Sequence, residues 1–187
     1  MLELATTTIP DRRPGTTVLP MVALLDWLGA HGLAYDLHEH PPAFTALEAA
    51  HVEGLDPHAF VKTLAVVRSD GRRALVALEA GDRLDPAAAS SLMDGERIRL
   101  LTEGELLDLA GRCDIGALPP IGDLFGVPVY ADVALRSAER VTFHAGSHRH
   151  AVRMLRLDWE RCARIRYGHL ATSSDLIAGR VTEWSWY

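Results

Sequence analysis

The feature that most constrains the fold is a pair of apolar runs separated by a short polar turn. Residues 60–68 read FVKTLAVVR and residues 73–79 read RALVALE, with Ser-Asp-Gly-Arg between them. Branched and aromatic apolar residues favour strands, and an Asp-Gly pair between two such runs is a strong hairpin signal. We therefore predict two antiparallel strands, the first of them largely buried.

The first strand carries Lys62, which is the only lysine among 19 basic residues. Side chains alternate between the two faces of a strand, so Lys62 shares a face with the apolar residues Phe60 and Leu64. A lysine among core positions either extends to water at a strand end or lines a pocket that receives an anion. The alternative is chance, because a GC-rich genome replaces most lysines with arginine.

The rest of the chain predicts short strands with helices between them at irregular intervals. Two capping boxes support two of the helices, formed by Thr45 with Glu48 and by Thr102 with Glu105. Without a repeated βαβ unit, this order indicates an α+β fold around a mixed or antiparallel sheet. The predicted helices are 20–31, 46–53, 86–93, 103–110, 133–137 and 158–166, and the further strands are 33–38, 97–101, 127–131, 140–145 and 149–155.

The length of 187 residues fits one domain, which we place at residues 20–170. Residues 1–19 are predicted to be a flexible tail, and residues 171–187 a C-terminal extension whose WSWY ending is a packed strand or a partner-docking patch. No apolar run approaches the length of a membrane span, and the two separate cysteines indicate reduced thiols. We expect a cytoplasmic protein that binds no membrane.

The charge is uneven along the chain. Between residues 133 and 170, eight arginines against three carboxylates give +5, so a net charge of -6 leaves -11 for the rest. An acidic body with one basic region is compatible with docking a polyanion at that region, and argues against general coating of nucleic acid such as DNA. A solvated surface with scattered arginines explains the same counts.

Two further segments have the composition of a binding site. Residues 113–132 hold six glycines and prolines that stiffen the chain or let its backbone approach a ligand, and residues 143–150 read FHAGSHRH. His144, His148 and His150 suggest zinc, but they straddle a predicted turn at residues 146–148 and have no carboxylate among them, so we predict no metal and no cofactor. His38 and His40 are expected at a strand end or on the surface. The common nucleotide-binding and hydrolase motifs are absent.

Taken together, the segments YDLHEHPP, VKTLAVV, GALPPIGD, VPVYAD, FHAGSHRHAVRM and DWER resemble the YbaK and prolyl-tRNA synthetase-associated editing domain family, over residues 33–166. The resemblance implies a free-standing aminoacyl-tRNA deacylase, built as one compact α+β domain with a mixed, mostly antiparallel, barrel-like sheet flanked by helices. Its partners would be a mischarged tRNA, bound at the 3′ aminoacyl end, and a synthetase or elongation factor that presents this tRNA.

The resemblance also implies the site. Lys62 falls on the family's essential lysine and is the implied catalytic residue. His144 stands where the family often carries asparagine. The implied substrate-binding residues are Thr45, Gly116, Ala117, Leu118, Pro119, Pro120, Gly122, His144, Gly146, Ser147 and His148.

Ester hydrolysis needs the carbonyl held against a water and the developing negative charge stabilised, which backbone donors of a glycine-rich loop can do. We expect Lys62 to anchor the terminal phosphate, with the water activated by the substrate itself. Pro119, Pro120 and Ile121 are expected to shape a small pocket for alanine, cysteine or serine, carried by a tRNA for proline. The alternatives are a non-catalytic module that binds aminoacyl-tRNA or a protein, a hydrolase of another small ester, and a metal-dependent enzyme.

Overall fold

The computed structural model describes residues 20–95, 97–111 and 113–172. The helices are α1 (Pro20–Ala30), α2 (Ala46–Val52), α3 (Pro86–Leu92), α4 (Glu103–Ala110) and α5 (Arg156–Cys162), with 3-10 turns η1 (Pro57–Ala59), η2 (Gly122–Leu124) and η3 (Val133–Ser137). The strands are β1 (Tyr35–Glu39), β2 (Phe60–Arg68), β3 (Arg73–Glu79), β4 (Arg83–Leu84), β5 (Ile98–Leu100), β6 (Val129–Asp132), β7 (Arg140–Ser147), β8 (His150–Leu155), β9 (Arg166–Gly168) and β10 (Ala171–Thr172).

The main sheet runs in the order β1-β8-β7-β2-β3-β6-β9, and β5 also pairs with β2. β7 runs parallel to β2, and β6 runs parallel to β3 and β9, while the other pairs in this sheet are antiparallel. The strands at the two ends, β1 and β9, do not pair, so the barrel that we expected does not close. The α+β class and the mixed, mostly antiparallel sheet are confirmed.

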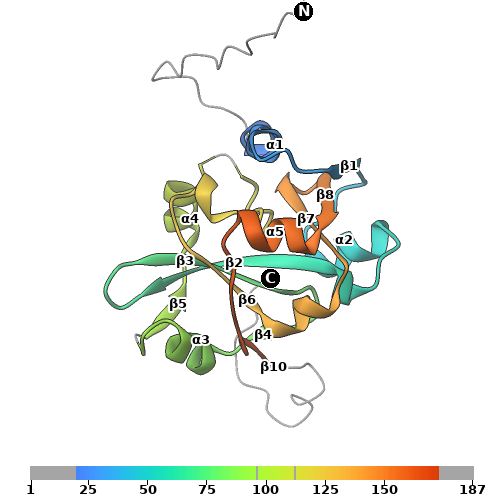
Figure 1. Cartoon of the computed structure of the whole chain (residues 1–187). Helices are drawn as coiled ribbons and strands as arrows, with labels where there is room; N and C mark the ends of the chain where they lie inside the picture. The colour runs from blue at the N-terminus through green and yellow to red at the C-terminus, as the bar shows by residue number, and fades with distance from the viewer. Residues whose placement is uncertain (1–19, 96, 112, 173–187) are drawn as a thin grey trace, which may run out of the picture.

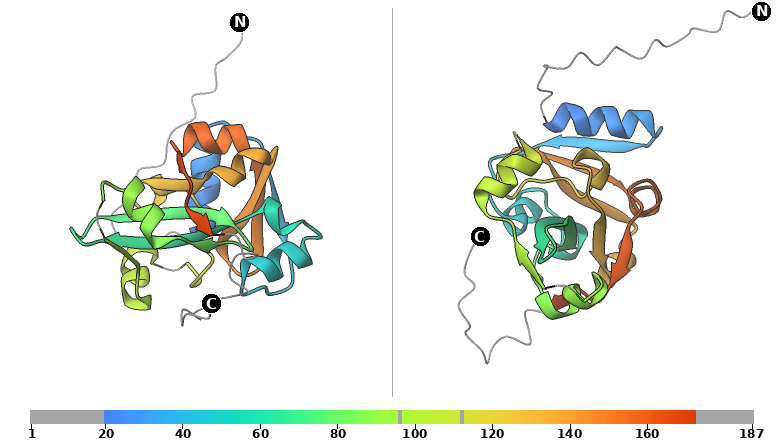
Figure 2. Two further views of the ribbon diagram at one scale, coloured as in Figure 1. Left: turned by 90° about the horizontal axis from the view of Figure 1, so that it is seen from below. Right: turned by 90° about the vertical axis from the view of Figure 1, so that its left-hand side faces the viewer.

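The long β2–β3 hairpin separates two helical layers (Figure 1). On one face, α1 and α5 cover an apolar cluster that includes Leu28, Val61 and Trp159. On the other face, α3 covers a cluster that includes Val66 and Leu78. Side chains on β2 therefore enter one layer or the other according to whether their position is odd or even. The two views in Figure 2 show α1 lying outside the strands at one edge of the fold.

The local signals in the sequence predict several elements correctly. β2 and β3 have the expected bounds and pair in the hairpin, with Lys62 opposite Leu78. Both capping boxes form, at the N-terminus of α2 and of α4. These elements depend on residues close together in the chain, which is why the sequence is sufficient for them.

Two predicted elements exist with different bounds. The predicted helix 158–166 is α5, which begins at Arg156 and ends at Cys162; Arg164 then adopts a positive φ of 53°, and Arg166 starts strand β9. The predicted turn at residues 146–148 is displaced, because β7 continues to Ser147 and the turn into β8 falls at His148 and Arg149. Gly146 has φ 87°, and the register shifts between His144 and Ser147, so a bulge keeps Gly146 and Ser147 within the strand.

The predictions for the chain ends concern residues that the structure does not describe. The tail 1–19 and residues 173–187, with WSWY, lie outside the described ranges. Ala171 and Thr172 pair with β4. No helix in the described part of the chain is long and apolar enough to cross a membrane.

Candidate functional site

Lys62 lies at an interruption in the sheet. On one edge, β2 pairs with β7 only at Phe60 and Val61, and with β5 only from Val66 onward. Beyond Val61 the end of β7 turns to another partner, because Gly146 N–H donates to the carbonyl of Ala117 at 3.0 Å. Among the described residues, the segment from Lys62 to Leu64 therefore has no strand partner on this edge.

The ammonium of Lys62 is half-buried and hydrogen-bonded to backbone. It donates to the carbonyl oxygen of Ala80, at 3.2 Å, and to that of Asp82. An ammonium has three N–H donors, so these bonds leave one for a ligand. Burial lowers the pKa of Lys62, the carboxylate of Asp82 raises it in part, and Arg83 lowers it again.

The carboxylate that affects Lys62 is that of Asp82, and further acidic residues lie around Asp82. Burial raises the pKa of Asp82, and the negative charge of Asp132 adds to this effect. Asp132 itself is 5% exposed and accepts hydrogen bonds from the backbone of Leu170 and Ala171. Nearby, His58 pairs with the buried carboxylate of Glu79, and this hydrogen bond raises the pKa of His58. Of these groups only Asp82 acts on Lys62 to raise its pKa, and burial outweighs it, so the pKa of Lys62 is lowered overall.

Three histidines gather beside this interruption. The ring of His144 lies 5.9 Å from that of His40, 5.7 Å from that of His148 and 5.2 Å from that of Phe60, between ring centroids. His144 follows Phe143, the last residue of β7 that pairs with β2, and its ring packs against Phe60, which lies on the same face of β2 as Lys62, two residues away. His40, expected to pack at a strand end or to lie on the surface, directly follows strand β1 and packs there beside His144. His40 is 6% exposed, held by backbone bonding to Arg149.

Several buried nitrogens of these rings have no hydrogen-bond partner among the described residues. They are Nδ1 and Nε2 of His144, Nε2 of His40 and Nδ1 of His148. Burial lowers the pKa of His144 to about 4, helped by the other two histidines and partly opposed by Asp114 and the nearby backbone of His150. A neutral imidazole can donate from one nitrogen and accept at the other, so these groups are suited to a polar ligand.

The Gly116 loop packs against this histidine cluster. Asp114 receives a hydrogen bond from the backbone of His148 at 3.0 Å. A β-carbon at Gly116 would lie 3.8 Å from Cε1 of His148 and 3.9 Å from the carbonyl oxygen of Phe44, and Gly116 has φ 88°. The loop therefore reaches the site with exposed backbone at Gly116, a conformation that glycine adopts without strain.

The second half of this loop packs in the core. Leu118 and Ile121 pack in apolar clusters, and Pro119 and Pro120 are buried. At Gly122 a β-carbon would lie 2.0 Å from the carbonyl oxygen of Val127, so glycine is required by packing. The structure shows these residues buried in the core, and their expected role as walls of a small pocket stays a prediction.

The other predicted residues have the following positions. Thr45 accepts a hydrogen bond from the backbone of Glu48 and caps α2. Ala117 and Gly146 bond to each other, and Ser147 contacts Nδ1 of His150 at 2.8 Å. No group of three His, Cys, Asp or Glu residues within the described part of the chain is arranged to hold a metal ion. Two surface cavities, of about 370 and 430 Å³, lie elsewhere and are not lined by Lys62 or His144.

A sequence model of the aminoacyl-tRNA editing domain matches residues 40–162, which contain Lys62, the Gly116 loop and the histidine cluster. The chain belongs to this family. A solved structure of a candidate trans-editing enzyme for prolyl tRNA synthetase is 26% identical, with a TM-score of 0.74 over 84% of this chain and 100% of that chain. A hypothetical protein at 23% identity has the same fold, with a TM-score of 0.74 over 80% of this chain and 99% of that chain.

Among curated proteins, the proline-tRNA ligase of Shouchella clausii (strain KSM-K16) is 34% identical over 112 residues. These residues make up 60% of this editing-family chain and 19% of the ligase, so the chain spans about a fifth of that relative. The similarity thus concerns one part of a much longer enzyme.

The basic region between residues 133 and 170 is largely neutralised in this editing domain. Arg140 pairs with Asp36, Arg156 with Glu160, Arg161 with Asp158 and Arg164 with Asp123. Arg136 stacks on Tyr167 at 4.2 Å. The excess positive charge counted along the sequence is therefore not a single patch, and of this group Arg166 alone lines the 370 Å³ cavity.

Proposed function

We propose that this protein is a trans-editing deacylase that hydrolyses the ester of a mischarged tRNA, with a small amino acid such as alanine, cysteine or serine carried by a tRNA for proline. The observation that carries the proposal is the position of Lys62: its ammonium, bonded to two backbone carbonyls, lies on β2 where the pairing with β7 has ended. Phe60, two residues away on the same face, contacts the ring of His144, whose nitrogens have no partner among the described residues. Membership of the editing family and the similarity to part of a proline-tRNA ligase support the choice of substrate.

In this proposal Lys62 binds the terminal phosphate and orients the ribose. Its remaining N–H donates to a phosphate oxygen, and the negative phosphate holds the ammonium charged. The neutral ring of His144 donates to or accepts from the aminoacyl group, and the exposed backbone at Gly116 supplies a donor to the oxygen on which charge develops. The substrate's own hydroxyl or amine activates the water.

Size selection follows from the cost of volume in a buried site. A synthetase separates two side chains that differ by one methylene by only about 1–3 kcal/mol, so a second site that admits the smaller one improves fidelity. Two neighbours of His144, Phe60 and His40, are buried, and in this proposal their rings limit the size of the side chain that the site admits. Proline itself is therefore expected to be excluded and its tRNA to be spared.

The test is deacylation of alanyl-, cysteinyl- and seryl-tRNA for proline by the wild type, Lys62→Ala and Lys62→Arg, with prolyl-tRNA as the cognate control. We expect turnover of at least one mischarged tRNA, loss of that turnover in Lys62→Ala and no turnover of prolyl-tRNA. Retention of most activity in Lys62→Arg supports the anchoring role, because arginine keeps the charge and cannot act as a base. Circular dichroism confirms that each variant is folded.

If the wild type binds aminoacyl-tRNA but hydrolyses none of the mischarged tRNAs, the proposed deacylase activity is overturned. A non-catalytic binding module of the same fold is then favoured. Equal turnover in wild type and Lys62→Ala would remove Lys62 from the reaction. The expected partners beyond the tRNA, a synthetase or elongation factor, and the cytoplasmic location remain predictions.

A further inference from the structure

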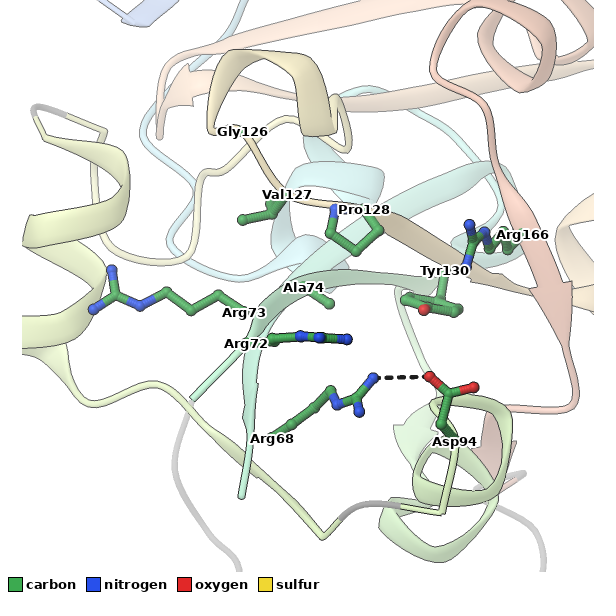
Figure 3. A pocket seen from close by; sticks show the side chains of 10 residues that line it. All are labelled: Arg68, Arg72, Arg73, Ala74, Asp94, Gly126, Val127, Pro128, Tyr130 and Arg166. Atoms are coloured by element: carbon green, nitrogen blue, oxygen red, sulfur yellow. Dashed lines mark hydrogen bonds and ion pairs between the residues drawn. The ribbon is translucent and has the colours of Figure 1, made fainter. Parts of the chain in front are cut away.

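A cleft of about 370 Å³ lies at the turn end of the β2–β3 hairpin, and arginine side chains dominate its lining (Figure 3). Arg68 comes from β2, Arg72 from the turn, Arg73 from the start of β3 and Arg166 from β9. In Figure 3 the side chains of Arg68 and Arg72 extend toward the side of Tyr130 and Arg166, whereas Arg73 extends the opposite way. Residues that are nearly a hundred positions apart thus converge on one cleft.

The sheet fixes this convergence. Val66 pairs with Ala74, Val76 with Tyr130, and Tyr130 with Arg166. Paired residues lie on the same face, so Tyr130 and Arg166 project from the face that carries Arg68 and, at the far end of β2, Lys62. The guanidinium of Arg166 lies 5.9 Å from the ring centroid of Tyr130.

The charges in the cleft are incompletely balanced. Arg68 is fixed by Asp70 at 2.9 Å and Asp94 at 3.0 Å, with its side chain 11% exposed. Arg72 has only a long contact of 3.7 Å to Asp70 and is 76% exposed. For Arg166 the structure gives no ion pair with any described residue. Arg72 and Arg166 therefore present planar N–H donors that match a phosphate group.

We propose that this cleft binds phosphates of the tRNA backbone and so positions the acceptor stem while the 3′ end lies at Lys62. The inference rests on the proposed function. In a chain with a net charge of -6, RNA is repelled by most of the surface, so a local excess of arginine decides how it docks. The contacts are to phosphate and independent of base sequence.

The distance between the two sites agrees with a nucleic acid that spans both. Lys62 and Arg68 are six residues apart on one strand, a separation of roughly 20 Å at about 3.3 Å per residue. Successive phosphates of a stacked strand advance about 3.4 Å, so the cleft lies at least about six nucleotides from the terminal ribose. α3 and its apolar cluster fill the face between the two positions, and the RNA passes outside this layer. Six nucleotides from the 3′ end is where the acceptor stem is double-stranded.

The test compares two substrates that carry the same aminoacyl ester, a full-length tRNA and a CCA trinucleotide without a stem. The variant is Arg72→Gln with Arg166→Gln, and the control is Arg161→Gln, on the exposed side of α5 in the opposite layer. We expect kcat/KM on the full-length tRNA to fall about tenfold or more in the double variant. The slope of log affinity for tRNA against log salt concentration should become less steep by about two units. The loss should be confined to the full-length substrate, and Arg161→Gln should match the wild type.

An equal loss on both substrates, or no loss on the full-length tRNA, would overturn the inference. A cleft that binds only a free anion would also overturn the inference. In that case inorganic phosphate raises the melting temperature of the wild type but not of the double variant, while the two proteins bind tRNA with equal affinity. Unchanged melting temperatures without phosphate confirm that the double variant is folded.

Binding of uncharged tRNA separates this inference from the proposed deacylase. If wild type hydrolyses neither substrate but binds tRNA more tightly than Arg72→Gln with Arg166→Gln, the deacylase fails and the cleft stands. If wild type hydrolyses both substrates and the double variant binds tRNA equally well, the deacylase stands and the cleft fails.

Discussion

The indole nitrogen of Trp159 donates a buried hydrogen bond of 2.9 Å to the carbonyl oxygen of Pro120. The two residues are 39 positions apart, and this bond joins α5 to the loop that begins at Gly116. Because Trp159 is fully buried, no water replaces the bond when it is lost. The position of the loop thus depends on a residue in α5, which packs in the same apolar cluster as Ile121.

Trp159→Phe should lower the free energy of unfolding by about 2–4 kcal/mol, since it leaves a buried carbonyl unpaired and a cavity behind. Trp27→Phe is the matched control, because Trp27 makes a longer bond of 3.4 Å to the exposed Asp123 and should cost less. Urea denaturation measures both. Equal losses would show that packing volume, and not the bond to Pro120, is what Trp159 contributes.

Gly122→Ala should prevent correct folding of the loop. The added β-carbon would lie 2.0 Å from the carbonyl oxygen of Val127 and 2.9 Å from Val129 Cγ2, so the backbone must move. We expect a loss of about 3 kcal/mol or more in the free energy of unfolding.

Gly104→Ala is the control for Gly122→Ala. Gly104 lies in α4 with nothing within 4 Å of an added β-carbon, and alanine favours helix by up to about 1 kcal/mol. This variant should therefore be neutral or more stable than wild type in thermal denaturation. A Gly122→Ala protein as stable as Gly104→Ala would contradict the packing shown here.

His144 should make the fold sensitive to mild acid. Its pKa is lowered to about 4 in the folded state against 6.5 for the free group, so the unfolded state binds the proton more readily. The contribution of neutral His144 to the free energy of unfolding is fully present above pH 6.5. It is lost as the pH falls toward 4, by up to about 3 kcal/mol. His144→Asn should remove this part of the pH dependence, measured as the difference in melting temperature from wild type.

His58 provides the comparison for His144, because its pKa shift has the opposite sign. Glu79 raises the pKa of His58, so its contribution is complete below pH 6.5 and is lost as the pH rises through the folded value. His58→Gln should therefore lower stability below pH 6.5 without changing its slope there, and remove the loss that wild type shows as the pH rises above 6.5. An acid slope that is identical in wild type and His144→Asn would mean that folding does not lower the pKa of His144.

Asp132→Ala should destabilise the fold by about 3 kcal/mol or more. Its buried carboxylate accepts from the backbone of Ala134, Leu170 and Ala171, at 2.8, 2.6 and 2.9 Å, and the variant leaves three donors unpaired. Asp85→Ala removes a similar carboxylate that only caps α3 and should cost about 1 kcal/mol. Chemical denaturation distinguishes the two, and equal costs would show that the bonds of Asp132 contribute no more than a half-buried helix cap.

The sequence by itself determined the elements whose signals are local. The β2–β3 hairpin follows from the Asp-Gly turn between two apolar runs, and the two capping boxes each involve residues three positions apart. Alternation along β2 likewise places Lys62 on the face of Phe60 and Leu64. The family resemblance, which depends on the order of several short motifs, was also present in the sequence and is confirmed by the match to residues 40–162.

Only the tertiary structure decided which segments meet. The pairing of β2 with β7 ends after Val61, which leaves Lys62 on an open edge. This separation depends on a competing hydrogen bond between Ala117 and Gly146. His40 is buried beside His144, and Arg72 and Arg166 line the same cleft. Both arrangements depend on pairings between strands that are far apart in the chain. Strand register is set by burial of whole faces against other elements, and no local propensity encodes that choice.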